Sequence, residues 1–227
     1  MRCIDSLPAR AHKSILLIAL SVTTALCIAP LEASPLRQLG RSVNDEALIA
    51  ALADAPLADA FEILHAAAER PDERPELLRA LVNGLPSHRR WVSHMLAAHY
   101  LERAMLGPDG SPRAEQVPAL SLELLAREYH HIEDSTLQTV FFRLCTAYQW
   151  PPPNTVLMHA ANQLLERTQR SAGKLDAPWR RLARDYFQAA ALRPDPALAR
   201  LIDEIRRALR DRELVLLARA SAAAMFD

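Results

Sequence analysis

The chain has little cysteine, glycine or lysine, and it carries no excess charge of either sign. Of its three cysteines, Cys3 and Cys27 lie in the first 33 residues, so Cys145 stands alone in the rest. A single cysteine excludes an internal disulfide there, and its apolar neighbours predict a small buried side chain rather than a nucleophile. The 27 acidic and 27 basic side chains balance. This balance argues against a nucleic-acid-binding protein, which normally has a basic excess.

The five glycines all stand between segments of helical periodicity, so none is left for a phosphate-binding loop. The His-Glu-x-x-His, Gly-x-Ser-x-Gly and dinucleotide-binding glycine motifs are also missing. We therefore expect no bound cofactor, and the sequence favours a protein without catalytic activity. A hydrolase or metalloenzyme stays open, because missing motifs do not exclude a cleft assembled from distant residues.

A secretory signal peptide is predicted over residues 1–33. Two arginines and a lysine precede an uncharged run of 16 residues, 14–29, and Ala33 precedes the expected cut. As a helix this run spans about 24 Å, shorter than the bilayer core, which favours cleavage over a permanent anchor. Cleavage would leave one soluble domain, 34–227, in the periplasm or the medium. An uncleaved anchor and an ordinary buried helix are the alternatives.

The remainder is predicted to be all-α. Large apolar residues recur at spacings of three and four, β-branched residues are scarce, and no run alternates strictly. Short connections predict stacked antiparallel hairpins, and an α-solenoid-like stack is one arrangement they allow. The longest gap, 107–118, could divide the domain into halves. The predicted helices are 44–54, 57–69, 75–83, 87–106, 119–131, 136–149, 154–172, 178–192 and 196–225.

Three helix starts carry capping signals. Ser135, with Gln138 three residues later, forms a capping-box pattern. Asp176 and Asp195 are each followed by a proline within two residues, which predicts a carboxylate cap and a proline in the first turn.

The last predicted helix, 196–225, contains no glycine or proline. Its apolar residues form a short seam of the coiled-coil type, which predicts packing inside the chain first and dimerisation second. The seam residues are Leu198, Ile202, Ile205 and Leu209.

Two Glu-x-x-His motifs are candidates for a metal site. Paired motifs of this kind, with a carboxylate from each of two further helices, form di-iron sites in helical bundles. The residues that could take these roles are Glu62, His65, Glu128 and His131, with Glu102 and Glu46 as the extra carboxylates. Both motifs lie beside the apolar stripes rather than on them, so surface ion pairs are the favoured interpretation and no metal is expected.

Arginines stand beside tryptophan at two helix starts, which makes them candidates for a protein interface. Arginine and tryptophan are enriched at interfaces, and a guanidinium can stack on an indole ring. The favoured alternative is that each tryptophan anchors its helix in the core under arginine stems. The residues are Arg89, Arg90 and Trp91, and Trp179, Arg180 and Arg181.

The sequence thus predicts an exported bacterial protein that acts as a protein–protein interaction module or scaffold. The chain has 25 arginines but only two lysines, Lys13 and Lys174. Codon usage in a GC-rich genome explains this. A lysine-poor surface would also resist ubiquitination, so a secreted virulence factor acting in a host cell is the alternative.

Overall fold

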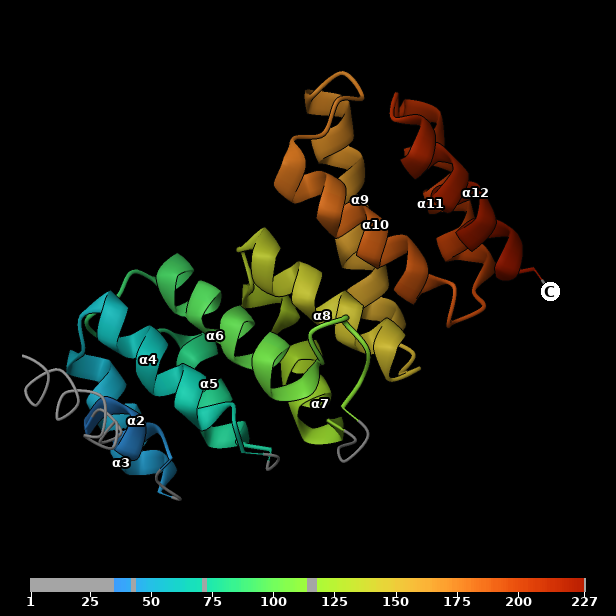
Figure 1. Ribbon diagram of the computed structural model, residues 1–227. Helices are drawn as coiled ribbons and strands as arrows, with labels where there is room; N and C mark the ends of the chain where they lie inside the picture. The colour runs from blue at the N-terminus through green and yellow to red at the C-terminus, as the bar shows by residue number, and fades with distance from the viewer. Residues whose placement is uncertain (1–34, 42–43, 71–72, 114–117, 227) are drawn as a thin grey trace, which may run out of the picture. The chain divides into compact units, whose positions relative to one another are not determined.

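A computed structural model describes residues 35–41, 44–70, 73–113 and 118–226, so the signal-peptide prediction lies outside the described residues. Leu36–Asp227 form one compact unit. The described part is all-helical, as predicted, and its single β contact is an isolated bridge between Leu106 and Pro112. Its helices are α2 (Pro35–Gly40), α3 (Asp45–Asp54), α4 (Leu57–Ala67), α5 (Pro75–Asn83), α6 (Arg90–Met105), α7 (Ala119–Glu128), the 3-10 helix η1 (Tyr129–His131), α8 (Ser135–Ala147), α9 (Asn154–Arg170), α10 (Ala177–Ala190), α11 (Pro196–Ala208) and α12 (Arg212–Ala224) (Figure 1).

Aspartate side chains begin most of the C-terminal helices. Asp176 and Asp195 accept hydrogen bonds from amides of the first turns of α10 and α11, so both predicted caps are confirmed. The predicted cap at Ser135 is wrong. Asp134 takes that role instead, with Oδ1 accepting from the amides of the second and third residues of α8. A carboxylate also complements the positive end of the helix dipole better than a hydroxyl does.

The prediction of one helix over 196–225 is also wrong, because α11 ends before Leu209 and α12 starts at Arg212. Asp211 has extended backbone, and its Oδ1 accepts hydrogen bonds from the Glu213 and Leu214 amides. The two helices fold back on each other. Leu198 and its three partners in the predicted seam are buried within the chain, so the seam serves internal packing.

Helix contacts follow two series. The first series is α4, α6, α8, α10 and α12, and each of these helices packs on the next. The second series is α3, α5, α7, η1, α9 and α11, and here too each helix packs on the next. Chain neighbours such as α5 and α6, or α9 and α10, pack across between the series (Figure 1). Because each helix contacts both series, the buried faces form one hydrophobic core rather than separate ones.

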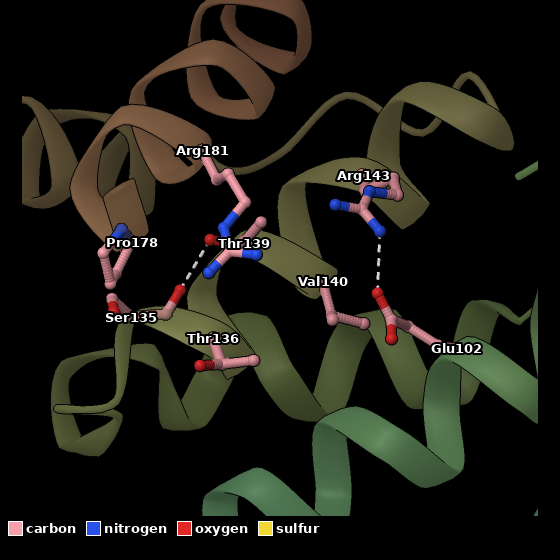
Figure 2. Close-up of a pocket in the computed structure, with 8 residues that line it drawn as sticks. All are labelled: Glu102, Ser135, Thr136, Thr139, Val140, Arg143, Pro178 and Arg181. Atoms are coloured by element: carbon pink, nitrogen blue, oxygen red, sulfur yellow. Dashed lines mark hydrogen bonds and ion pairs between the residues drawn. The ribbon is translucent and has the colours of Figure 1, made fainter. Parts of the chain in front are cut away.

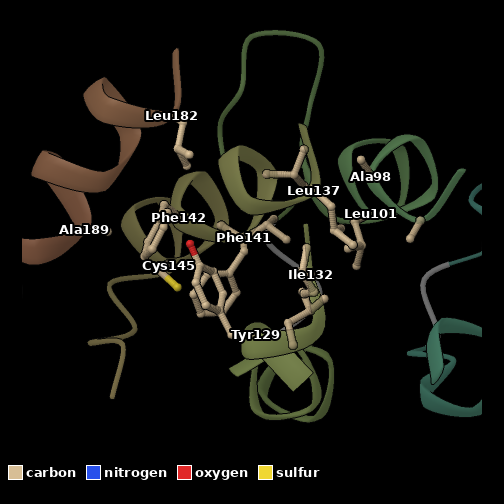
Figure 3. Close-up of a cluster of buried hydrophobic side chains, with 14 of the residues drawn as sticks. Ala98, Leu101, Tyr129, Ile132, Leu137, Phe141, Phe142, Cys145, Leu182 and Ala189 are labelled. Carbon is tan, nitrogen blue, oxygen red and sulfur yellow. The ribbon is translucent and has the colours of Figure 1, made fainter. Parts of the chain in front are cut away.

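Aromatic rings fill the centre of this core, where α8 meets η1 and α10. The ring of Phe142 lies 5.5 Å from that of Tyr129 and 5.3 Å from that of Tyr186. The Tyr186 hydroxyl donates to the Leu157 carbonyl at 3.1 Å. Cys145 lies in the same cluster, so the buried position predicted for it is confirmed, and burial raises the pKa of its thiol far above the usual value (Figure 3).

The described part of the 107–118 loop is fastened to the end of α6 and to the residue that follows α8. The Arg113 amide donates to the Met105 carbonyl of α6 at 3.1 Å. Tyr148, just after α8, places its hydroxyl 2.7 Å from the same carbonyl and 3.4 Å from the Arg113 carbonyl. Buried side chains of the core lie both before and after the loop. Among the described residues, no helix combines the length and hydropathy needed to cross a bilayer.

Candidate functional site

Three adjoining cavities lie along α4, α6, α8 and α10, and together they form what we call the groove. Their volumes are about 310, 970 and 190 Å³. The first lies between α2, α4 and α6, and the second between α6, the described part of the 107–118 loop, α8 and α10. The third lies between α6, α8 and α10. His99 lines the first and second, while Glu102 and Arg143 line the second and third, so each cavity adjoins the next.

Arg143 joins α6 to α10 in the middle of the groove. Its Nη1 donates to Glu102 Oε1 at 2.7 Å, and its Nε and Nη2 both donate to Asp185 Oδ2 at 3.2 Å. The Asp185 side chain is only 11% exposed, against 43% for Glu102. Burial raises the pKa of the Asp185 carboxyl, and this outweighs the opposing effect of Arg143. The groove therefore contains a buried carboxylate whose charge is stabilised chiefly by Arg143.

Hydroxyl groups and a second guanidinium line the third cavity. Thr139 donates its hydroxyl proton to the Ser135 carbonyl at 2.6 Å, and Thr136 completes the α8 side. Figure 2 shows the Arg181 side chain extending from α10 into this cavity. This lining is mostly polar, and its apolar members are Val140 on α8 and Pro178 on α10.

The first Glu-x-x-His motif lies at the α4 end of the groove. Glu62 and His65 line the first cavity together with His99, and Arg37 lies 3.9 Å from the Glu62 carboxylate. The ring of His99 makes an edge contact with Phe61, at 5.0 Å between centroids. Burial lowers the pKa of His99, which is therefore neutral at pH 7.

The structure does not bring the other metal candidates to this cavity as a set. Glu102 is held by Arg143. Glu128 ends α7, while His131 in η1 and Glu46 in α3 are exposed. The described part of the chain contains no group of three or more His, Cys, Asp or Glu side chains placed to hold a metal ion.

The two arginine–tryptophan clusters lie at the helix starts on one edge of the α6–α8–α10 layer. Arg90, Trp91 and Trp179 line one cavity of about 280 Å³, which we call the tryptophan pocket, together with Glu133 and Asp134. Trp91 is 55% exposed, so the interpretation of this ring as a core anchor is wrong. Trp179 is half-buried.

The remaining interface candidates lie around this pocket or on the adjacent helix. Arg89 is the exposed residue before α6, and Arg181 belongs to the groove. Arg180 forms an ion pair with Asp211 at 2.7 Å, so it ties α10 to the start of α12. The guanidinium over the Trp179 ring belongs to Arg167, at 5.5 Å, rather than to either neighbouring arginine.

Sequence reasoning did not identify Arg143 or Asp185, which form the centre of the groove. Each is a charged residue within an apolar stretch, at Phe-Phe-Arg-Leu-Cys in α8 and at Leu-Ala-Arg-Asp-Tyr-Phe in α10. A charge in such a stretch signals a partner on another helix, because an isolated buried charge is costly. That signal was available, although it does not name the partner.

No protein-family model matches the chain, and comparisons with curated proteins and with solved structures find no match.

Proposed function

We propose that this chain is an exported protein-interaction module, built as an α-solenoid-like stack of antiparallel hairpins, that binds a polypeptide segment of a partner in the groove. The observation that carries the proposal is the row of three adjoining cavities along α4, α6, α8 and α10. Two series of helices, each packed on the next member, are the contact pattern of a solenoid. Solenoids use extended faces of this kind to bind other proteins.

The lining of the groove suits a polar polypeptide better than an apolar ligand. Each of the three cavities is lined by side chains of both charges, among them Glu62 in the first, Arg103 and Asp185 in the second and Arg181 in the third. Side-chain pairing with a partner of mixed charge gives register and specificity more than affinity. A weak or transient complex is therefore the expected kind of interaction.

Site-specific photocrosslinking in the producing cell tests this proposal. A photoreactive amino acid is placed at Arg103 or Gln188, which line the groove and have exposed side chains. Matched positions are Gln169 on α9 and Glu123 on α7, which are exposed and line none of the cavities described above. One defined protein crosslinked from the groove positions alone supports the proposal. Equal crosslinking from all four positions, or none from the groove, overturns it.

Export is tested separately by N-terminal sequencing of the protein recovered from each cell fraction. A chain that begins at Ser34 in the periplasm or the medium supports cleavage of the leader after Ala33. An intact chain found in the cytosol would remove export from the proposal and leave the groove to be judged by crosslinking.

A further inference from the structure

The tryptophan pocket contains a buried histidine with an unused nitrogen. His94 lines the pocket and is 1% exposed. Its Nε2 lies 3.0 Å from the Val82 carbonyl, which can only accept, so Nε2 carries the proton and Nδ1 is a bare acceptor in the neutral ring. Nδ1 is buried without a hydrogen-bond partner among the described residues. Burial lowers the pKa of His94, so the ring is neutral at pH 7.

Two carboxylates give the same pocket an acidic lining. Asp134 is partly committed, because its Oδ1 caps α8. Glu133 is exposed, and no ion pair joins it or Asp134 to Arg90 in the described part of the chain. The two carboxylates outnumber the single guanidinium, so the pocket favours a cation over an anion.

Two indole rings complete the set. Trp91 at the start of α6 and Trp179 at the start of α10 both line the pocket. The face of an indole attracts an ammonium group and also packs against methylene groups. The pocket therefore offers aromatic surface and negative charge, the combination that recognises an alkylammonium ion, and one of its lining residues keeps a buried acceptor without a partner.

We propose that the tryptophan pocket binds an alkylammonium group that carries N–H donors, as a lysine side chain or a free primary amine does. The ammonium donates to the Glu133 carboxylate, and its methylene groups lie against Trp91 and Trp179. His94 Nδ1, which is closed to solvent in the free chain, gains a donor when the pocket opens around the ligand. Ser135 lines both this pocket and the third cavity of the groove, so the two sites adjoin. A lysine of a polypeptide in the groove could thus reach the pocket, and in that form the inference rests on the proposed function.

The test is calorimetric titration of the purified full chain with n-butylammonium and with N-acetyl-lysine N-methylamide, with tryptophan fluorescence as a second readout. Both probes should bind. Glu133→Gln should weaken binding about fivefold and Trp91→Ala about threefold. Glu123→Gln and Leu120→Ala are the matched controls, because both residues are exposed on α7. These two variants should bind as the parent chain does.

Tetramethylammonium tests the hydrogen bonds of the ammonium without altering the protein. It has the same charge but no N–H to donate, so it should bind about fivefold more weakly than n-butylammonium. Equal binding of the two ions would overturn recognition through N–H donors. The absence of saturable binding of either amine, or equal losses in Glu123→Gln and Glu133→Gln, would overturn the site.

A capped peptide with one lysine between alanines separates the two sources of the ammonium. Tighter binding of this peptide than of n-butylammonium identifies a protein-borne lysine, and equal binding identifies a free amine; both support the site. None of these titrations needs a partner protein. Failure here therefore leaves the crosslinking result at Arg103 and Gln188 to decide the proposed function by itself.

Discussion

Replacing Arg143 should destabilise the fold more than replacing its buried partner Asp185. In Arg143→Met, the Asp185 side chain keeps its 11% exposure and loses both of its hydrogen bonds to a cation. Removing one member of a fully buried ion pair costs about 3–5 kcal/mol, and an exposed pair is worth about 0–1 kcal/mol. Because the Arg143 side chain is 37% exposed, we expect an intermediate loss of about 2 kcal/mol in the free energy of unfolding.

Asp185→Asn should lower the free energy of unfolding much less than Arg143→Met does, by about 0.5 kcal/mol or less. The physical reason is that burial raises the pKa of Asp185 in spite of Arg143, so the ionised carboxylate is not favoured in the fold. In this variant Arg143 keeps Glu102 as a partner and remains partly in water. The double variant should recover most of the loss seen in Arg143→Met, since neither charge is then left buried alone.

Urea unfolding at pH 7, followed by circular dichroism, measures all three variants. Arg170→Met is the matched control, because Arg170 forms an exposed pair with Glu166 within α9, and its loss should stay within about 0.5 kcal/mol. The penalty in Arg143→Met should shrink as the pH falls. A folded-state pKa above the unfolded value means that the folded chain holds a proton that the unfolded chain has lost, so acidification stabilises it. Equal losses in Arg143→Met and Asp185→Asn, or additive losses in the double variant, would refute this reasoning.

Three further predictions concern stability, and urea unfolding measures each of them. Asp211→Ala should lower the free energy of unfolding by about 1.5 kcal/mol, because the Asp211 carboxylate no longer caps α12. A loss smaller than that of an alanine substitution on a helix surface would contradict this capping role. Gly173→Ala should cost about 2 kcal/mol more than Gly110→Ala. Both glycines have positive φ, but a Cβ at Gly173 would lie 2.4 Å from the Ala208 carbonyl oxygen, whereas a Cβ at Gly110 would meet open space. Equal losses of unfolding free energy in the two variants would show that this clash does not matter. Burial lowers the pKa of His94 below the usual 6.5, so on acidification the unfolded chain takes up a proton at this residue before the folded chain does. The free energy of unfolding should therefore fall as the pH drops below 6.5, and it should fall less in His94→Gln.

Local patterns predicted the helices well, because helix formation depends on residues three and four apart. The periodicity gave the all-α class, and Asp176 and Asp195 were identified as caps from the residues that follow them. The errors at Ser135 and in 196–225 share one cause. In both places an aspartate cap was overlooked: Asp134 begins α8 one residue earlier than expected, and Asp211 begins a new helix inside 196–225. Capping by a carboxylate is local, so both caps could have been recognised from the sequence.

The groove could not be predicted in the same way, because its side chains come from helices far apart in the chain. Arg143 and Asp185 are 42 residues apart, and Arg143 and Glu102 are 41 apart. Periodicity assigns each of them to a helix face but does not determine which faces meet. The metal hypothesis failed to gain support for the same reason: Glu62 and Glu128 occupy similar motifs, yet they lie on helices that the contacts place in different series.

The exposure of Trp91 shows what the interpretation of the tryptophans as core anchors overlooked. That interpretation placed each tryptophan in the core, yet the rings of tyrosine and phenylalanine already fill the core, Phe142 and Tyr186 among them. Trp91 is therefore not required by the fold, and Trp91→Ala should change the free energy of unfolding by less than about 0.5 kcal/mol. The same variant should weaken alkylammonium binding. Because unfolding and binding are measured on one protein, a large loss of stability would mean that the ring is structural, and only a selective loss of binding is consistent with a pocket formed by Trp91, Trp179 and His94.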